Sequence, residues 1–526
     1  MKLRTSISRK ALLFTAIGGM VGSGWLFGPY FAAKAAGPAA IIAWLLGGML
    51  MLVIALTFAE LASSFPAAGG IVRYAELSHG KLTSFTLSWV AWLAAAMVAP
   101  IETMAAMQYA ADYLPNLAVH VDKTINLTHI GIAVAMALMF IMCIVNYYAV
   151  KFFAKSNSII VSWKLIIPFA TILILLIHKF QPSNFFSHGF MPLGWHGILA
   201  ALPTAGVIFS FIGYSPVIQL AAEAKNPQRT IPFAIIGAII ICILLYCLLE
   251  FAYIGALNPE HFSSGWTNLN YKNDAGPIAG IIGAFGIIWF LKILYIDALI
   301  SPLSTAYIYT TATARMNMAM SHIGFMPQWM QRVNQYSSPW NAILTNFFVG
   351  ILFFLPFPGW QSMVSFLVSC FVVAYAIGPL SCAALRKSLP QVKRPFKLPF
   401  VNFICLSAFY ICNLIVYWTG WHVIWKMLLT ITLGYLFLLI QQNFREQKIN
   451  MDIKHGSFIF VYLIGMGVIA YLGSFGGIKL IPFGWDFLVL AIFSIVVFQY
   501  AQYAAIKNRD IESLTHINYQ LAERKS

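Results

Sequence analysis

The chain has 526 residues, of which 60% are hydrophobic and only 9% are Asp, Glu, Lys or Arg. A soluble globular protein carries roughly 25% charged residues, so this composition excludes a soluble fold and indicates a protein that folds within lipid. The net charge is +16, but the basic residues lie in short groups between apolar runs. They form no nucleic-acid footprint, so we expect membrane lipid and no nucleic acid as a partner.

The sequence carries no motif of an enzyme or of a metal site. The seven cysteines lie within or at the edge of apolar runs, and no pair has the CxxC spacing of a metal site. The histidines lie mostly in loops or at the ends of apolar runs, and no Ser/His/Asp grouping or HExxH motif is present. We therefore expect no catalytic residues, no metal and no cofactor.

Fourteen apolar segments are candidates for membrane-spanning helices, because about 20 apolar residues cross the hydrocarbon core. The basic residues 1–10 are interpreted as the cytoplasmic flank of the first span, since no cleavage site of a signal peptide follows. The predicted spans are roughly residues 11–33, 38–62, 83–109, 130–150, 157–179, 198–221, 232–256, 278–312, 341–356, 361–385, 400–419, 422–442, 457–475 and 483–506.

The distribution of Lys and Arg predicts the orientation of these spans. With the N-terminus in the cytoplasm, 24 of the 32 basic residues fall on the inner side and six on the outer side. The other two, Lys164 and Lys292, lie inside spans. A missing or extra span would place alternate loops on the wrong side. The distribution thus favours fourteen spans in the plasma membrane, with both termini in the cytoplasm.

The first span contains a cluster of glycines. Gly18, Gly19, Gly22, Gly24 and Gly28 fall within eleven residues. Each glycine inside a helix costs about 1 kcal/mol relative to Ala, and every main-chain group freed in lipid needs a partner. A break is tolerable where it lines a polar cavity, because free N–H groups there bind a carboxylate and free carbonyl groups bind a cation. Close helix packing through a GxxxG pair is the alternative.

The sixth span is interrupted in the same way. It contains Pro203, Gly206, Gly213 and Pro216. Interruptions in corresponding spans are the pattern of inverted-repeat transporters, and a separation of five spans gives the two units opposite orientations. Phe209 lies just before the second interruption, where it would cover a ligand. An ordinary aromatic residue of the core is the alternative for Phe209.

Charged residues inside a span are costly and are candidates for function by default. Lys164 lies in the fifth span, where its amine could exchange a proton during transport or act as a fixed cation; a structural ion pair is the alternative. Asp297 begins a polar stripe on one face of the eighth span, which suits a water-filled path, with packing as the alternative. Glu102 and Lys292 are expected to lie near an interface or to pair elsewhere. The other members of the stripe are Ser301, Ser304 and Thr305.

Four motifs follow one another through the first 400 residues. They are GGMVGSGWLF at 18–27, AELASSFPAAGGIVRY at 59–74, AEAKNPQRTIP at 222–232 and LRKSLPQVKRPFKLP at 385–399. In this order they resemble the motifs of amino-acid permeases of the amino acid–polyamine–organocation (APC) superfamily. Length and pattern are similar to the bacterial aspartate–proton symporter branch. Two features depart from the family: residues 321–324 read SHIG where members often have ARDG, and many members have twelve spans.

The resemblance implies a leucine-transporter-like fold, in which spans 1–5 and 6–10 are inverted repeats and helices 1 and 6 are broken. Lys164 matches the lysine of helix five that stands in for sodium in proton-coupled members, and Ser301, Ser304 and Thr305 match the polar face of helix eight beside it. The first break would bind the carboxylate of the substrate, and the second its amino group and side chain. The implied contacts are Met20, Gly22, Ser23 and Gly24 in the first break and Phe209, Ser210, Ile212 and Gly213 in the second.

Together these features predict an all-α integral membrane protein. Residues 1–180 and 198–385 would be the two repeats, 400–507 additional helices and 508–526 a cytoplasmic tail. We expect a secondary active transporter that carries an L-amino acid with a proton by alternating access. An exchanger of amino acids or amines is an alternative. A third possibility is an amino-acid sensor without transport, although the short tail disfavours it.

Overall fold

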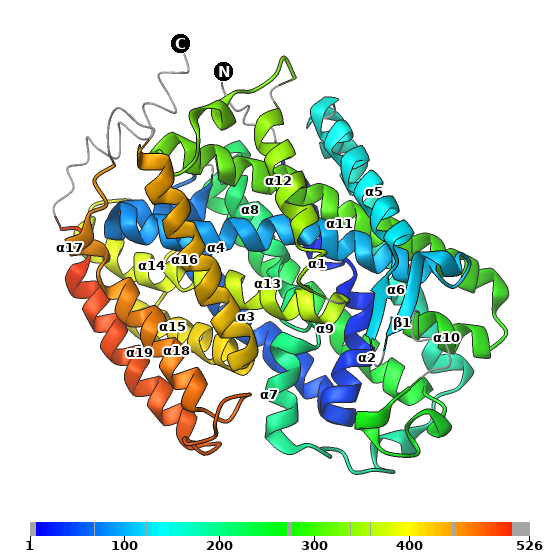
Figure 1. The fold of residues 1–526 in the computed structure, drawn as a ribbon. Coiled ribbons are helices and arrows are strands. Elements are labelled where there is room, and N and C mark those ends of the chain that lie inside the picture. Colours follow the sequence, from blue (N-terminus) through cyan, green and yellow to red (C-terminus); the bar gives the residue numbers. More distant parts are fainter. Residues whose placement is uncertain are drawn as a thin grey trace.

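A computed structural model describes residues 7–67, 69–121, 124–148, 150–270, 276–336, 338–357, 359–443 and 449–507, so the predicted tail, 508–526, lies outside the described residues. Within them the chain forms nineteen α-helices and one antiparallel pair of strands, β1 (Ala118–Val121) and β2 (Thr124–Leu127) (Figure 1). The helices are α1 (Arg9–Met20), α2 (Gly24–Ala36), α3 (Ala40–Ser64), α4 (Gly70–Ala110), α5 (His129–Tyr148), α6 (Val150–His178), α7 (Gly194–Thr204), α8 (Ser215–Gln219), α9 (Pro227–Ala256), α10 (Pro277–Ala284), α11 (Ile288–Ile323), α12 (Trp340–Leu352), α13 (Trp360–Tyr375), α14 (Ile377–Ser388), α15 (Val401–Trp418), α16 (Trp421–Asn443), α17 (Ile453–Gly456), α18 (Phe458–Leu472) and α19 (Trp485–Ala504).

Most of these helices are long and apolar. In the described part of the chain, eleven helical stretches could cross a membrane, or twelve with the bent pair formed by α7 and Phe209–Gln219. The protein is therefore a multi-pass, all-helical membrane protein, as its composition predicts. Each of the fourteen predicted spans contains at least one helix, but a count of fourteen is not confirmed. In particular, α12 has 13 residues, fewer than the roughly 20 that cross the hydrocarbon core.

The ends of the first helices follow from local sequence. Ser8 is the N-cap of α1, and its hydroxyl accepts a hydrogen bond from Ala11 N at 3.3 Å, which satisfies one of the free N–H groups of the first turn. The second helix ends at Gly37, which has a φ of +62°. Glycine adopts this conformation without the penalty that a side chain would add.

Two interruptions lie in the apolar segments in which glycine clusters predict them. Residues 21–23 separate α1 from α2, and residues 205–208 separate α7 from the 3₁₀ helix η4 (Phe209–Tyr214), with a bend of 43°. The helical turns beside the two interruptions are in contact. A Cβ atom built on Gly19 would lie 2.8 Å from Gly213 O, so the close approach of the two backbones requires glycine at position 19.

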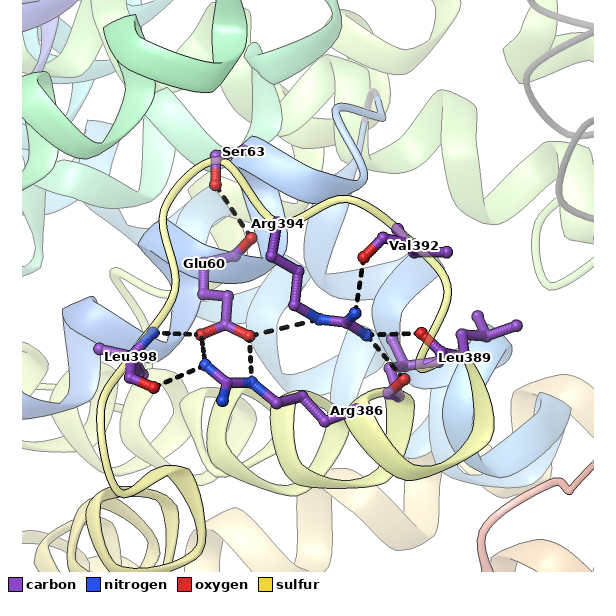
Figure 2. A network of polar contacts seen from close by, with 8 residues as sticks. Glu60, Ser63, Arg386, Leu389, Val392, Arg394 and Leu398 are labelled. Carbon is purple, nitrogen blue, oxygen red and sulfur yellow. Dashed lines mark hydrogen bonds and ion pairs between the residues drawn. The ribbon is translucent and has the colours of Figure 1, made fainter.

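Buried ion pairs join the end of α3 to the end of α14 and to the loop that follows it (Figure 2). The Glu60 carboxylate accepts hydrogen bonds from Arg386 Nε at 2.7 Å, Arg386 Nη2 at 2.5 Å and Leu398 N at 2.8 Å. The Arg394 Nε atom lies 3.5 Å from the same carboxylate, and its guanidinium group donates to three nearby main-chain carbonyl groups. Two of the four sequence motifs, 59–74 and 385–399, are thus held together by one carboxylate.

The substitution Glu60→Gln should lower the stability of the protein in detergent. Glu60 is only 2% exposed, and removal of one partner of a buried ion pair costs roughly 3–5 kcal/mol because the other charge stays buried. The measurement is the free energy of unfolding or the melting temperature. Glu76→Gln is the matched control, since Glu76 pairs with Arg73 on a partly exposed helix face, where a pair contributes about 1 kcal/mol or less. Equal losses in the two variants would contradict the role of Glu60.

Candidate functional site

The end of α1 leaves main-chain carbonyl groups at the negative end of a helix dipole, and these need donors. Gly18 O accepts hydrogen bonds from Lys164 Nζ at 2.7 Å and from Thr305 Oγ1 at 2.9 Å. Lys164 Nζ also donates to Thr305 Oγ1, at 2.7 Å. Met20 O accepts a hydrogen bond from the Tyr246 hydroxyl at 2.8 Å. A buried ammonium group and two hydroxyl groups therefore complete the end of this helix.

The start of α2 meets a carboxylate that comes from α4. Ser23 N donates to Glu102 Oε2 at 2.7 Å, and the Glu102 side chain is fully buried. A Cβ atom built on Gly22 would overlap the Glu102 carboxylate and the Thr305 hydroxyl, so this approach requires glycine at position 22. The N-terminal end of a broken helix binds anionic groups. Glu102 thus supplies the anionic group at the start of α2.

Three charged side chains lie together beside this interruption. Lys164, Glu102 and Asp297 are fully buried, and both carboxylates interact electrostatically with the ammonium group. Asp297 Oδ1 accepts a hydrogen bond from Ser301 Oγ at 2.8 Å. Within the described part of the chain, Glu102 Oε1 and Asp297 Oδ2 have no hydrogen-bond partner. Two carboxyl groups thus lie beside one amine in a buried place, where an unbalanced charge is costly. These two carboxyl oxygens are the atoms of the group at which a proton could bind.

Residues that follow the second interruption lie against α2 and α13. Ser210 Oγ donates to Gly206 O at 2.9 Å, and a Cβ atom built on Gly24 would overlap Ser210 Oγ. Ile212 O accepts a hydrogen bond from the Tyr375 hydroxyl at 3.3 Å. Residues of both interruptions therefore line one region, with glycines at the points of closest approach.

Aromatic rings cover the interruptions on one side, and Trp360 lies at their centre. Trp360 Nε1 donates a hydrogen bond to Ser23 Oγ at 2.8 Å. Its ring is edge-on to Phe209, with 6.0 Å between the ring centroids, and parallel to Phe31, with 5.6 Å between them. Phe27 lies 5.3 Å from the same ring. Phe209 is thus part of a buried aromatic cluster that connects α2, η4 and α13.

The residues singled out from the sequence mostly gather in this region. Ser304 differs, since it is half-buried and its hydroxyl donates to Ser301 O in its own helix at 3.0 Å. Glu102, expected near an interface or paired elsewhere, lies at the first interruption and accepts a hydrogen bond from Ser23 N. The rule that a charge inside a span is a candidate for function already includes Glu102, whereas no sequence signal indicates Trp360. Within the described residues, no three His, Cys, Asp or Glu side chains are arranged to hold a metal ion.

A multi-pass helical fold with buried charges at an interrupted helix defines the class of the protein as a membrane transporter. The chain belongs to the amino acid permease family, whose pattern it matches over residues 7–438. The protein is thus a permease and not an enzyme.

Three characterised relatives illustrate the range of the family. The chain is 35% identical over 524 residues to the glutamate/serine transporter AimA of Bacillus subtilis (strain 168), with 98% of this chain and 97% of the relative covered. It is 32% identical over 512 residues to the aspartate-proton symporter of the same organism, with 96% and 98% covered. The branched-chain amino acid permease BcaP is 24% identical over 466 residues, with 85% and 95% covered.

The substitution Gly22→Ala should abolish ligand binding at the first interruption, because the added methyl group displaces Glu102 and Thr305 from the main chain. The measurement is a thermal-shift screen of the purified protein against the twenty amino acids and common polyamines. A ligand that raises the melting temperature of the parent protein should no longer do so in this variant.

Gly237→Ala is the matched control for this substitution. A Cβ atom at position 237 would meet only Leu13, at an ordinary contact distance of 3.4 Å, and alanine is favoured over glycine inside a helix by about 1 kcal/mol. We expect the ligand-induced shift to persist in the control. An undiminished shift in Gly22→Ala would place the ligand elsewhere.

Proposed function

We propose that this permease is a secondary active transporter that carries an L-amino acid together with a proton across the plasma membrane. The interaction that supports this most strongly is the hydrogen bond from Ser23 N to Glu102, beside the Lys164 ammonium group. The main chain at the first interruption offers N–H groups to a substrate carboxylate, with Met20, Gly22 and Gly24 beside Ser23. Phe209, Ser210, Ile212 and Gly213 would contact the amino group and side chain.

The buried charges suggest how the proton takes part. The carboxylate of an amino acid would replace Glu102 at Ser23 N, and the displaced Glu102 would then be an unpaired buried anion unless it took up a proton. Lys164 holds the end of α1 in place and balances one of the two carboxylates. Asp297, with Ser301, Ser304 and Thr305, would form the polar path beside it. Binding of the substrate and of one proton would then favour each other.

The substrate class follows from the relatives by analogy. Their names specify glutamate, serine and aspartate, and one of them names a proton. We therefore propose L-glutamate, L-aspartate and L-serine as the first substrates to test. A free α-carboxylate and α-amino group are the features that the interrupted helices would recognise.

Transport would proceed by alternating access, with one helix bundle rocking against the other around the site. In this proposal, residues 1–180 and 198–385 are inverted repeats with helices 1 and 6 broken, residues 400–507 add further helices to give about fourteen spans, and both termini lie in the cytoplasm. The close contact between Gly19 near the end of α1 and Gly213 in η4 supports this arrangement.

An exchanger of amino acids is the second candidate, because the same site could bind and release amino acids without net proton movement. Counterflow in proteoliposomes with and without a proton ionophore separates the two. Exchange is independent of the ionophore, whereas accumulation by symport collapses when the ionophore is added. A sensor would bind the amino acid and show no flux in either condition.

Lys164→Ala should abolish the proton dependence of uptake. In proteoliposomes, a pH gradient should accelerate uptake by the parent protein, and the variant should lose about tenfold or more of this response, equivalent to about 1.4 kcal/mol in the barrier. Lys292→Ala is the matched control, since Lys292 is an exposed lysine on α11. Uptake that still follows the pH gradient after loss of Lys164 would refute its role.

Glu102→Gln should separate binding from coupling. The amide oxygen of glutamine can accept the hydrogen bond from Ser23 N, but the side chain cannot gain or lose a proton. We expect counterflow to persist in this variant while accumulation driven by a pH gradient disappears. Retained accumulation would show that Glu102 does not carry the coupled proton.

A further inference from the structure

α4 contains a break near one of its ends. Gly80 has a φ of +78° and a ψ of −174°, a conformation that is accessible mainly to glycine. In a continuous helix, Leu82 N would donate to Ser78 O. Here Leu82 N donates to Met451 O at 3.0 Å. Ser78 O accepts a hydrogen bond from Ile506 N at 2.9 Å. The two groups that the break separates are thus both satisfied by the C-terminal part of the chain.

Asp452 occupies the gap that the break opens. Its Oδ2 atom accepts a hydrogen bond from Lys81 N at 3.1 Å. A Cβ atom on Gly80 would lie 2.7 Å from the Asp452 Cβ atom, so the contact leaves no room for a side chain at position 80. Asp452 itself has a φ of +47°, which aspartate adopts more readily than most residues.

The helices that follow Asp452 also contact α4. α17 lies at the end of α4 that contains the break and also packs against α19 (Figure 1). His79 Nε2 donates to Ala501 O at 3.1 Å, and the imidazole lies 5.0 Å from the Phe458 ring. A Cβ atom on Gly456 would lie 2.7 Å from the Leu82 Cβ atom. The contact between α4 and the C-terminal helices is therefore close at every point of the break.

We propose that residues 451–506 act as a brace that fixes the angle of α4 at Gly80, with Asp452 as the positioning residue. Glu102 lies 22 residues beyond Gly80 in the same helix, which is roughly 33 Å at about 1.5 Å per residue. At this distance a rotation of about 5° at the break displaces Glu102 by about 3 Å, the length of one hydrogen bond. The main-chain bond that would otherwise fix this angle is missing. The C-terminal helices therefore act together with α11 and α13, which pack along α4, to set the position of Glu102 relative to Ser23.

Hydrogen exchange of the full-length protein in lipid nanodiscs, followed by mass spectrometry, tests the brace. Asp452→Ala should raise the exchange rate of the amides of Lys81 and Leu82 by about tenfold or more. Lys81 N loses its acceptor, and Leu82 N is bonded to Met451 O, which is then held less firmly in place. Asp452→Asn retains a carbonyl oxygen and should restore most of the protection. Lys454→Ala changes an exposed side chain two residues away and should leave exchange unchanged. Unchanged exchange in Asp452→Ala would overturn the proposal.

Gly456→Ala provides an independent variant, because its methyl group separates α17 from Leu82 while Asp452 stays in place. The same increase in exchange is expected, and protection equal to that of the parent protein would overturn the brace even if Asp452→Ala failed to fold.

The effect on transport rests on the proposed function, whereas the exchange measurement does not. Asp452→Ala should lower the maximal rate of amino-acid uptake severalfold with KM nearly unchanged, and Asp452→Asn should recover it. Faster amide exchange with an unaltered maximal rate would overturn the positioning of Glu102. If the parent protein showed no uptake, the proposed function would be refuted. The hydrogen-exchange measurement alone would then test the brace.

Discussion

A helix that stops inside a membrane must satisfy its free main-chain groups with side chains, since lipid offers no partners. The interruption between α1 and α2 imposes this constraint, and three other helices converge to meet it. Lys164 from α6 and Thr305 from α11 donate hydrogen bonds to Gly18 O. Glu102 from α4 accepts a hydrogen bond from Ser23 N. Side chains that satisfy the main-chain groups freed between α1 and α2 therefore form the site. This explains why its polar side chains are buried and why glycines lie where other residues approach most closely.

Ion pairs between residues that are far apart in the sequence recur at the helix ends. Glu60 joins the second and fourth motifs through Arg386. Glu223, in the third motif, pairs with Arg315 of α11 at 3.1 Å, and its carbonyl group accepts a hydrogen bond from Ile7 N at 3.0 Å. These bonds join segments that are far apart in the sequence, so they fix how the ends of distant helices meet.

Glycine and proline clusters indicate the places near which α1 and α7 end and the next helices begin, and the cost of charge inside a span singles out Lys164. Glu102 obeys that rule too, but 79 residues separate it from Ser23, and a single carboxylate in an apolar run does not reveal which helix it faces. No sequence pattern indicates the break at Gly80, since a single glycine is common in a helical segment. Its partners at 451–506 become visible only in three dimensions. The number of spans cannot be predicted in the same way, because the length of α12 alone does not decide whether this helix crosses the membrane.

The most direct test of substrate recognition at the first interruption is a structure of the full-length protein in nanodiscs with the amino acid that stabilises it most. The proposed mechanism predicts that the α-carboxylate lies about 3 Å from Ser23 N, with Glu102 turned away from that group. A structure in which Glu102 keeps its hydrogen bond to Ser23 N while the amino acid binds elsewhere would contradict the mechanism.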